Sequence, residues 1–217
     1  MSQLFLIRYG NEILQRTGEH LLLVGVAIAL AILISLPIGI AITRSPVARQ
    51  PVLAIANILQ TIPSLAMFGL LIPVVGIGSV PAIIALTLYS FLPIIRNTYT
   101  GIMAVDPAVR EAGRGMGMTD WQLLTQVELP LAAAVILAGV RVATVIAVGI
   151  ATIAAAIGAG GLGVFIFRGI AVVNNDLILA GAVPAAAIAL LADLSISWLE
   201  RRLTIAPGSP SALSHPR

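Results

Sequence analysis

Long apolar runs, separated by short polar segments, account for most of the chain. Each run approaches or exceeds the roughly 20 residues that a helix needs to cross a bilayer. The runs are rich in Ala, Leu, Ile and Val and lack the polar–apolar alternation of a β-strand, so they predict helices rather than membrane-barrel strands. The predicted spans are residues 21–42, 51–75, 80–95, 131–157 and 177–199. We therefore expect an all-α membrane protein with about five transmembrane helices.

Composition supports this class and excludes others. The chain has 217 residues, of which 59% are hydrophobic and only 10% are charged, whereas a soluble domain carries about 25% charged residues. An ordinary soluble enzyme and a disordered chain are both excluded. There is no cysteine, and His20 and His215 lie at opposite ends of the chain, so we expect no metal site. We also expect no catalytic residues and no nucleic-acid partner, because the spans hold no Ser–His or paired-Asp arrangement and no basic run has interleaved aromatic residues.

The arginines predict the orientation in the membrane. All 12 basic residues are arginine. Eight of them lie in the connections 43–50 and 96–130 or in the tail from residue 200, against three on the other side. Because short cytoplasmic connections carry the excess of Arg and Lys, we expect the first set to face the cytoplasm. The amino terminus then lies outside and the carboxyl terminus inside.

The same pattern divides the chain into three parts. Residues 1–19 are mixed and charged and are expected to form an extracytoplasmic segment. Residues 20–203 are expected to form the transmembrane domain. Residues 204–217 are rich in proline and serine and are expected to be a flexible cytoplasmic tail.

The connection 96–130 is long enough to hold structure of its own. Asp106 followed by Pro107 is a typical helix start, because the aspartate can cap the helix and proline is tolerated in the first turn. We expect a helix over residues 108–116.

A second short helix is predicted after Gly117, which permits a turn. Thr119 or Asp120 can cap it, and it is expected to span residues 121–128. Pro130 is expected to end it at the membrane. The connection therefore predicts two short helices, at an angle to each other, under the bilayer.

The connection contains Glu111-Ala112-Gly113, then three residues, Gly117, nine residues and Val127-Glu128-Leu129-Pro130. This order resembles the EAA loop of bacterial ABC importer permeases, whose pattern is Glu-Ala-Ala, three residues, Gly, nine residues and Ile-x-Leu-Pro. The chain has Gly and Val in place of one Ala and the Ile. The resemblance implies that the loop docks into a groove of an ATPase subunit and transmits its closure. The residues expected to couple the two subunits are Arg110, Glu111, Ala112, Gly113, Gly117, Trp121, Leu129 and Pro130.

The side chains of the loop fit such docking. Glu111 can pair with a basic residue of an ATPase, and Arg110 and Arg114 with acidic residues. Large apolar side chains dominate many protein interfaces. The candidates for apolar anchors are Met116, Met118 and Trp121. The alternative is a solvated amphipathic loop without a partner.

The resemblance extends over about residues 20–200 and is closest to permeases for osmoprotectants, namely glycine betaine, choline, carnitine and proline betaine. Segments 57–66, 89–99 and 154–163 also carry it. Related amino-acid permeases share parts of these segments, so an amino acid such as methionine or proline is the alternative substrate. The implied fold is that of a type I ABC importer permease. A stand-alone secondary transporter or channel is a further alternative, but it needs inverted repeats or an intramembrane ion site, and the sequence shows neither.

The resemblance also implies partners. Such importers, in the bacterial inner membrane, contain two permease subunits, identical or paralogous, two cytoplasmic ATPase subunits and an extracytoplasmic binding protein. The chain has no G-x-x-x-x-G-K-[ST] motif and no lysine to complete one. We therefore expect a transport subunit that is not itself an enzyme and holds no cofactor, with ATP and Mg bound by the partner ATPase, and with membrane lipid around the spans.

Polar residues in the second span are candidates for a translocation pathway. The spacing i, i+3, i+4, i+7 predicts one polar helical face that points inward, and Pro63 is expected to kink or break the helix and free backbone carbonyls. The alternative is interhelical hydrogen bonding. The candidate pathway residues, two of them from the third span, are Asn57, Gln60, Thr61, Ser64, Tyr89 and Ser90.

Two ionisable residues lie within predicted spans, Arg141 and Asp193. An unpaired charge in the membrane is costly. Both are predicted to lie in the inner half of the bilayer, so we expect them to pair with each other, or each with a neighbouring subunit, as a structural brace rather than a substrate site.

Glycines follow the fourth span. The spacing matches G-x-G-x-x-G, but a dinucleotide site would require a preceding strand, so we expect a hairpin of closely packed backbone instead. Residues 164–171 are apolar enough for a re-entrant or interfacial helix. The resemblance implies that this segment lies near an outer gate, formed by Gly158, Gly160, Gly161 and Gly163.

Overall fold

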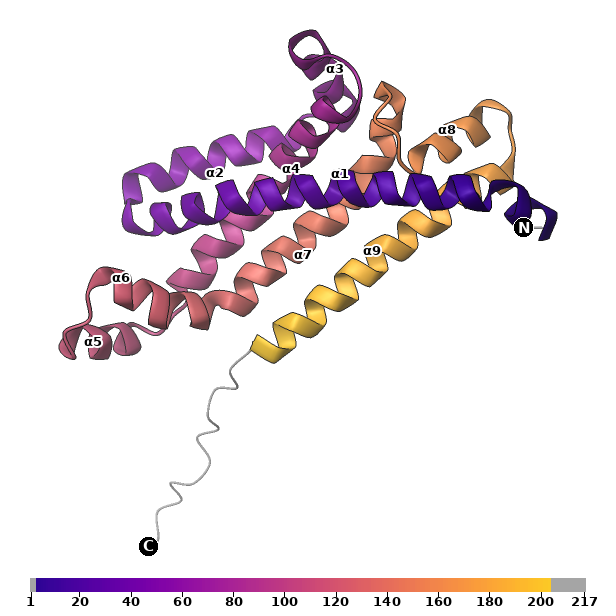
Figure 1. Ribbon diagram of the computed structural model, residues 1–217. Coiled ribbons are helices and arrows are strands. Elements are labelled where there is room, and N and C mark those ends of the chain that lie inside the picture. The colour runs from indigo at the N-terminus through magenta and orange to yellow at the C-terminus, as the bar shows by residue number, and fades with distance from the viewer. Residues whose placement is uncertain (1–2, 204–217) are drawn as a thin grey trace, which may run out of the picture.

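A computed structural model of the chain describes residues 3–203, with side chains from residue 9 onward, and the predicted tail 204–217 lies outside the described residues. The described part is helical, without strands (Figure 1). Its elements are α1 (Gln3–Arg44), α2 (Pro46–Thr61), α3 (Ser64–Val75), α4 (Ser79–Met103), α5 (Pro107–Gly115), α6 (Asp120–Leu123), the π-helix η1 (Leu124–Glu128), α7 (Leu129–Ile153), the 3₁₀-helix η2 (Ala154–Ile157), α8 (Gly163–Ala171) and α9 (Asn175–Leu203).

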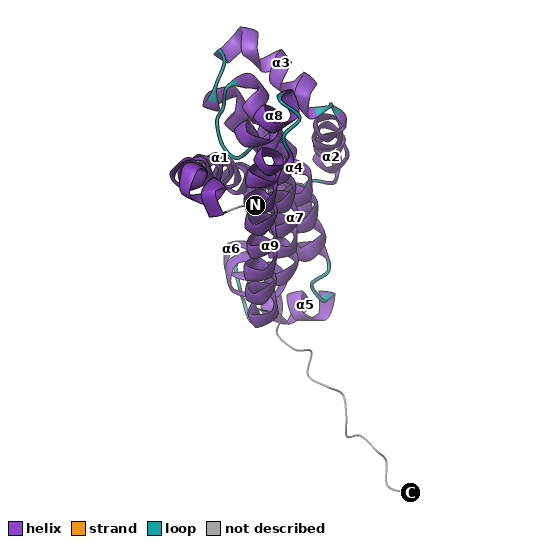
Figure 2. Ribbon diagram, turned by 90° about the vertical axis from the view of Figure 1, so that its right-hand side faces the viewer, coloured by secondary structure: helices purple, strands orange, loops and turns teal. Residues whose placement is uncertain are grey.

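Four stretches of helix are long and apolar enough to cross a membrane, and α2 with α3 forms a fifth if the bent pair is one span. The four are Tyr9–Arg44, Ser79–Met103, Asp120–Ile157 and Asn175–Leu203. The predicted all-α class with about five spans is confirmed. In both ribbon views α3 and α8 lie toward one end of the molecule, and α5 and α6 lie toward the other (Figure 1, Figure 2). The first is called the α8 end and the second the loop end.

Helices α1 and α4 are longer than the spans that the apolar runs predicted. α1 has 42 residues, which at 1.5 Å per residue is roughly 63 Å and about twice the hydrocarbon thickness of a bilayer. Its polar first half stays helical because Arg16 pairs with Glu12 and Glu19, one turn away on either side. The third predicted span was also too short, since α4 continues through Arg96 to Met103.

The second predicted span is broken rather than continuous. α2 ends at Thr61, α3 begins at Ser64, and the two axes differ by 99°. Pro63 lies at the break, as expected of a residue that lacks an amide hydrogen and restricts the residue before it. The freed carbonyl of Ile62 accepts a hydrogen bond from the hydroxyl of Tyr89 on α4, which confirms the prediction that Pro63 frees backbone carbonyls.

α4 is the central helix. It packs against both α1 and α7, which also contact each other, while α9 packs on α7 and α8 packs on α9. The largest core cluster joins α1, α3, α4 and α7, and its fully buried members include Phe68 and Leu86.

Small residues allow the close approach of these helices. A Cβ atom added to Gly39 of α1 would lie 2.6 Å from the Cβ of Thr98 on α4. One added to Gly139 of α7 would lie 2.6 Å from the Cβ of Asn97 and 2.7 Å from the carbonyl oxygen of Pro93, both on α4. Membrane helices associate mainly through such packing, because lipid provides no hydrophobic force between them.

An ion cluster ties α7 to α9. Arg141 Nη1 lies 3.2 Å from Asp193 Oδ1, and Arg141 Nε lies 3.0 Å from Glu200 Oε1. The predicted pairing of Arg141 with Asp193 is confirmed within one chain. Glu200 is an additional partner that the sequence did not suggest.

Replacing Gly139 with Ala tests the contact between α7 and α4. The added methyl group would meet a backbone carbonyl that cannot move freely, so we expect a loss of about 1–3 kcal/mol of stability. The measurement is the thermal midpoint of the purified protein in detergent. Gly149→Ala is the matched control, because Gly149 lies on the same helix and an added Cβ would meet nothing within 4 Å. Equal midpoints for the two variants would contradict this account of the contact.

Candidate functional site

The loop end holds the two helices that the sequence predicted. The carboxylate of Asp106 accepts a hydrogen bond from the amide of Ala108 at 2.8 Å and caps α5. Thr119 caps α6 in a reciprocal pair with Gln122. The turn between the helices contains Gly117, whose φ of +84° is a conformation that favours glycine.

The second predicted helix continues into the membrane instead of ending there. α6, η1 and α7 follow one another without a break, so the prediction that Pro130 ends a helix is wrong. Pro130 lies in the first turn of α7, where proline is tolerated. Leu129 is half-buried and begins the same helix.

The first three residues of the EAA-like motif differ in burial. Glu111 and Ala112 are exposed to solvent, whereas Gly113 is buried. A Cβ at Gly113 would lie 2.8 Å from Leu123 Cδ1 and 3.1 Å from Met118 Sδ. This contact explains why glycine suits the third position of the motif here, since it lets α5 lie directly on α6.

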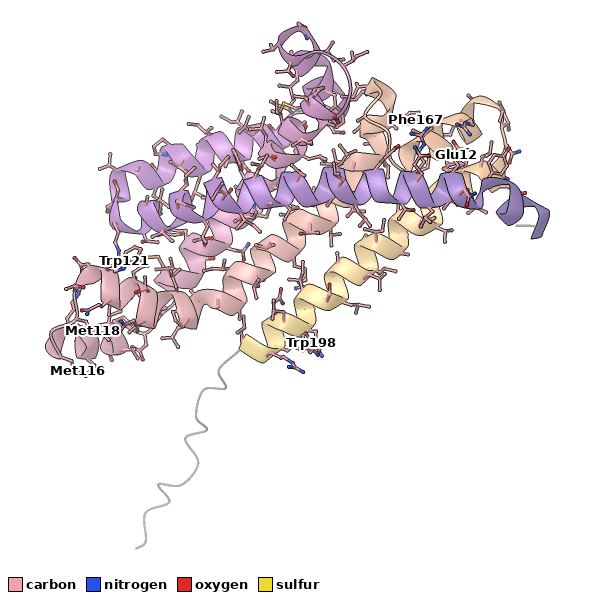
Figure 3. All side chains as sticks on the ribbon, in the orientation of Figure 1. Glu12, Met116, Met118, Trp121, Phe167 and Trp198 are labelled. Atoms are coloured by element: carbon pink, nitrogen blue, oxygen red, sulfur yellow. The ribbon has the colours of Figure 1, made fainter. Side chains whose placement is uncertain are left out.

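Large apolar side chains project from the same end. Met116 is 75% exposed and Trp121 is 71% exposed, and both lie at the tip of the molecule with Met118 between the two helices (Figure 3). Both side chains are therefore accessible at the loop end of the single chain. Met118 is half-buried against Gly113 and is less available than predicted.

Arg110 is directed inward. Its Nε lies 3.1 Å from Glu128 Oε1, and its guanidinium donates a hydrogen bond to the carbonyl of Ile102 at the end of α4. Arg110 is therefore engaged within the chain, and its pairing with an acidic residue of a partner stays a prediction. Glu128 also forms an ion pair with Arg44, the last residue of α1.

The predicted polar stripe of the second span does not form one face. Asn57, Gln60 and Thr61 lie on α2, but Ser64 begins α3 beyond the 99° break. Asn57 and Thr61 are exposed, and the Thr61 hydroxyl donates to the carbonyl of Ile58 at 2.7 Å. Prediction of one stripe failed because it assumed helical geometry through Pro63.

The two candidates from the third span are buried structural residues. Tyr89 is 3% exposed and Ser90 is 1% exposed. The Tyr89 hydroxyl is bonded to Ile62, as described above, and the Ser90 hydroxyl donates to the carbonyl of Leu86 at 2.8 Å. Both hydroxyl groups donate hydrogen bonds within the chain, and the assignment of Tyr89 and Ser90 to the pathway stays a prediction.

Two grooves run between α2 and α4. One is apolar and is lined from α1, α2 and α4 by residues that include Ile38, Ala56 and Phe91. The other contains Asn57 of α2 and Arg96 of α4. The polar candidates on α2 therefore lie on an outward surface of the single chain and not in an enclosed channel.

The glycine segment at the α8 end has the predicted tight backbone. Gly158, Gly160 and Gly161 have φ angles of +77°, +81° and +76°. Gly163 packs so closely that an added Cβ would lie 1.9 Å from the carbonyl oxygen of Thr152. The helix predicted over residues 164–171 is present as α8.

Acidic residues of α1 hold this segment in place. Glu19 Oε2 accepts a hydrogen bond from the amide of Gly161 at 2.9 Å and another from Arg16 Nη1 at 2.9 Å. On the next helix, Arg168 of α8 forms an ion pair with Glu12 at 3.0 Å (Figure 3 labels Glu12). The α8 end is therefore tied to the polar first half of α1.

Sequence reasoning missed the acidic partners in these clusters. Glu19 and Glu128 each lie directly beside an apolar run, which is a signal that the carboxylate needs a partner. Each also has a distant partner, Gly161 for Glu19 and Arg44 for Glu128, which lie 142 and 84 residues away, and only the fold identifies these two. Within residues 3–203 no group of three or more acidic or histidine side chains is placed to hold a metal ion.

Comparison with known proteins gives near full-length relatives. The carnitine transport permease protein OpuCB of Listeria monocytogenes is 47% identical over 195 residues, covering 90% of this chain and 89% of the relative. The glycine betaine/carnitine/choline transport system permease protein OpuCB of Bacillus subtilis is 45% identical over 200 residues and 92% of each chain. A chain of the MetNI methionine ABC transporter, solved in inward-facing conformations, has a TM-score of 0.82 at 25% identity, covering 94% of this chain and 100% of that chain.

These likenesses agree with the site geometry, in which an exposed helical loop continues into a bundle of membrane helices. The structural match confirms the predicted type I ABC importer permease fold. Residues 20–205 match the family described as binding-protein-dependent transport system inner membrane component, and the chain belongs to that family.

Proposed function

We propose that the chain is the membrane-spanning subunit of an ATP-driven importer for osmoprotectants of the quaternary ammonium class, such as glycine betaine, carnitine or choline. The observation that carries the proposal is the similarity along nearly the whole chain to permeases named for these substrates. The alternative is an amino acid such as methionine or proline. It has less support, because the methionine transporter is only 25% identical to this chain.

The loop end is proposed to be the site where an ATPase docks. Glu111 and Ala112 are exposed on α5, and the apolar side chains of Met116 and Trp121 are exposed at the same end. Exposed aromatic and methionine side chains supply much of the binding energy in protein interfaces. Two ATPase subunits, which bind ATP and Mg, would each receive the loop of one permease subunit, the second permease being identical or paralogous.

The opposite, α8 end is proposed to face outward, toward the binding protein. In this orientation the amino terminus is extracytoplasmic and the arginine-rich loop end is cytoplasmic, as the distribution of arginines favours. The glycine segment and α8 then lie at the outer mouth, held by Glu19 and by the pair of Arg168 with Glu12.

The translocation pathway is proposed to form between two permease subunits. Asn57, Gln60 and Thr61 lie on α2, away from the core of the single chain, so a second subunit facing α2 would enclose them. A quaternary ammonium nitrogen cannot donate hydrogen bonds, so selective capture requires aromatic faces, and only 5% of the residues are aromatic. We therefore assign substrate selectivity mainly to the external binding protein.

Uptake into liposomes tests the function. The chain is reconstituted with its ATPase subunits and its binding protein, and the uptake of labelled glycine betaine, carnitine, choline, methionine and proline is measured. We expect uptake of at least one quaternary ammonium compound that requires ATP and the binding protein. Uptake of methionine or proline alone would favour the alternative, and uptake without ATPase subunits would overturn the importer proposal.

Replacing Trp121 with Ala tests the docking surface. Trp121 is 71% exposed, so its removal should leave the fold intact but weaken association with the ATPase by about 2 kcal/mol, or roughly 30-fold. The measurement is the dissociation constant of the permease for the ATPase in detergent or nanodiscs. Trp198→Ala is the matched control, because Trp198 is 56% exposed but lies on α9, far from the loop end (Figure 3). An equal loss of affinity in both variants would contradict docking through Trp121.

A further inference from the structure

One carboxylate at the loop end is completely buried between two arginines. The Glu128 side chain is 0% exposed, whereas those of Arg110 and Arg44 are 19% and 41% exposed. These three residues are called the Glu128 cluster. A buried carboxylate is tolerated only when it is paired, so the cluster persists only while both its surroundings and its arginines stay in place.

The cluster joins the ends of several helices at one point. Arg44 is the last residue of α1, Arg110 lies on α5, and Glu128 directly precedes α7. Arg110 reaches a further helix, because its guanidinium also donates to the carbonyl of Ile102 at the end of α4. A displacement of any of these elements therefore changes the position of the same carboxylate.

α5 has few other ties to the membrane helices. Its backbone packs mainly on α6 and η1, and Glu111 and Ala112 on its outer side are exposed. A displacement of α5 can reach α4 through the short connection 104–106, and it can reach α7 through α6 and η1. A side-chain route from α5 to α1 runs from Arg110 through Glu128 to Arg44.

The backbone at Glu128 is itself unusual. Residues 124–128 form a π-helix, and the amide of Leu129 bonds to the carbonyl of Leu124 five residues earlier. Such segments are uncommon and often occur at functional sites. Here the π-helix is the joint between the loop and α7, and the buried carboxylate occupies its last position.

We propose that Glu128 is a positioning residue that transmits displacement of α5 to α1 and α7 through its ion pairs with Arg110 and Arg44. The inference rests on the proposed function, since it needs an ATPase that moves α5. In this proposal the residue that connects α5 to α1 and α7 is buried and does not itself touch the ATPase.

A second charge cluster provides the comparison. Arg141, Asp193 and Glu200 also form ion pairs, but they join α7 to α9 and do not include α5. Breaking that cluster should weaken the bundle without interrupting the connection from α5. Comparing a variant of each cluster therefore distinguishes a loss of stability from a loss of transmission.

The experiment compares Glu128→Gln with Asp193→Asn in the complete complex with ATPase subunits and binding protein. Both substitutions remove one negative charge and keep the side-chain size. The readouts are the amount of assembled complex, its thermal midpoint, and the stimulation of ATP hydrolysis by the loaded binding protein per assembled complex. We expect Glu128→Gln to reduce the stimulation by at least about fivefold, and Asp193→Asn to lower the midpoint while the stimulation stays as in the wild type.

Arg44→Gln is the second test variant, for use if the Glu128→Gln permease does not assemble into the complete complex. Arg44 is 41% exposed, and its loss leaves the pair of Arg110 with Glu128 in place, so folding is less affected. We expect an intermediate loss of stimulation in the assembled complex, because only the connection to α1 is removed.

Normal stimulation in the assembled Glu128→Gln or Arg44→Gln complex, beside a working wild type, would overturn the inference and leave the proposed function standing. Equal loss of stimulation in Asp193→Asn would also overturn it, since the effect would then follow stability. A wild-type complex in which the binding protein fails to stimulate ATP hydrolysis would instead contradict the proposed function.

Discussion

The close approach of α4 to α1 and α7 is the constraint on which the rest of the structure depends. In lipid, helices gain little from burying apolar surface against each other, so their association relies on close packing. Gly39 and Gly139 provide it on the two sides of α4. From this central position α4 holds the α2–α3 break through Tyr89 and receives Arg110 at Ile102. The α2–α3 break and the loop helix α5 thus both contact one helix, while the α8 end is held by α1.

Charged side chains connect elements that this packing alone would leave loosely joined. Arg168 and Glu12 join α8 to α1, Arg141 joins α7 to α9, and Glu128 gathers the loop end. In a chain with only 10% charged residues, these described ion pairs act as ties between helices.

Features that depend on local chemistry could be predicted from the sequence. Apolar run length located the membrane helices, the Asp106 cap and Gly117 turn located the loop helices, and the cost of an unpaired charge predicted the pair of Arg141 with Asp193. Features that depend on distant contacts could not. The inward direction of Arg110 requires knowing where Glu128 lies, and Pro63 could be identified as a breaker without indicating the angle that follows it.

In the proposed function, the loop end divides two tasks between two kinds of residue. Docking requires side chains that are exposed before the partner arrives, and Trp121 and Met116 meet that requirement. Transmission requires contacts that hold when the partner moves, and exposed ion pairs are too weak for this because water and salt screen them. A carboxylate with 0% exposure is screened far less. The proposed docking surface and the Glu128 cluster therefore differ in solvent exposure as the two tasks require. Glu128 is part of the sequence motif, but its burial and its pairing with Arg44 depend on the fold and could not be predicted from the motif.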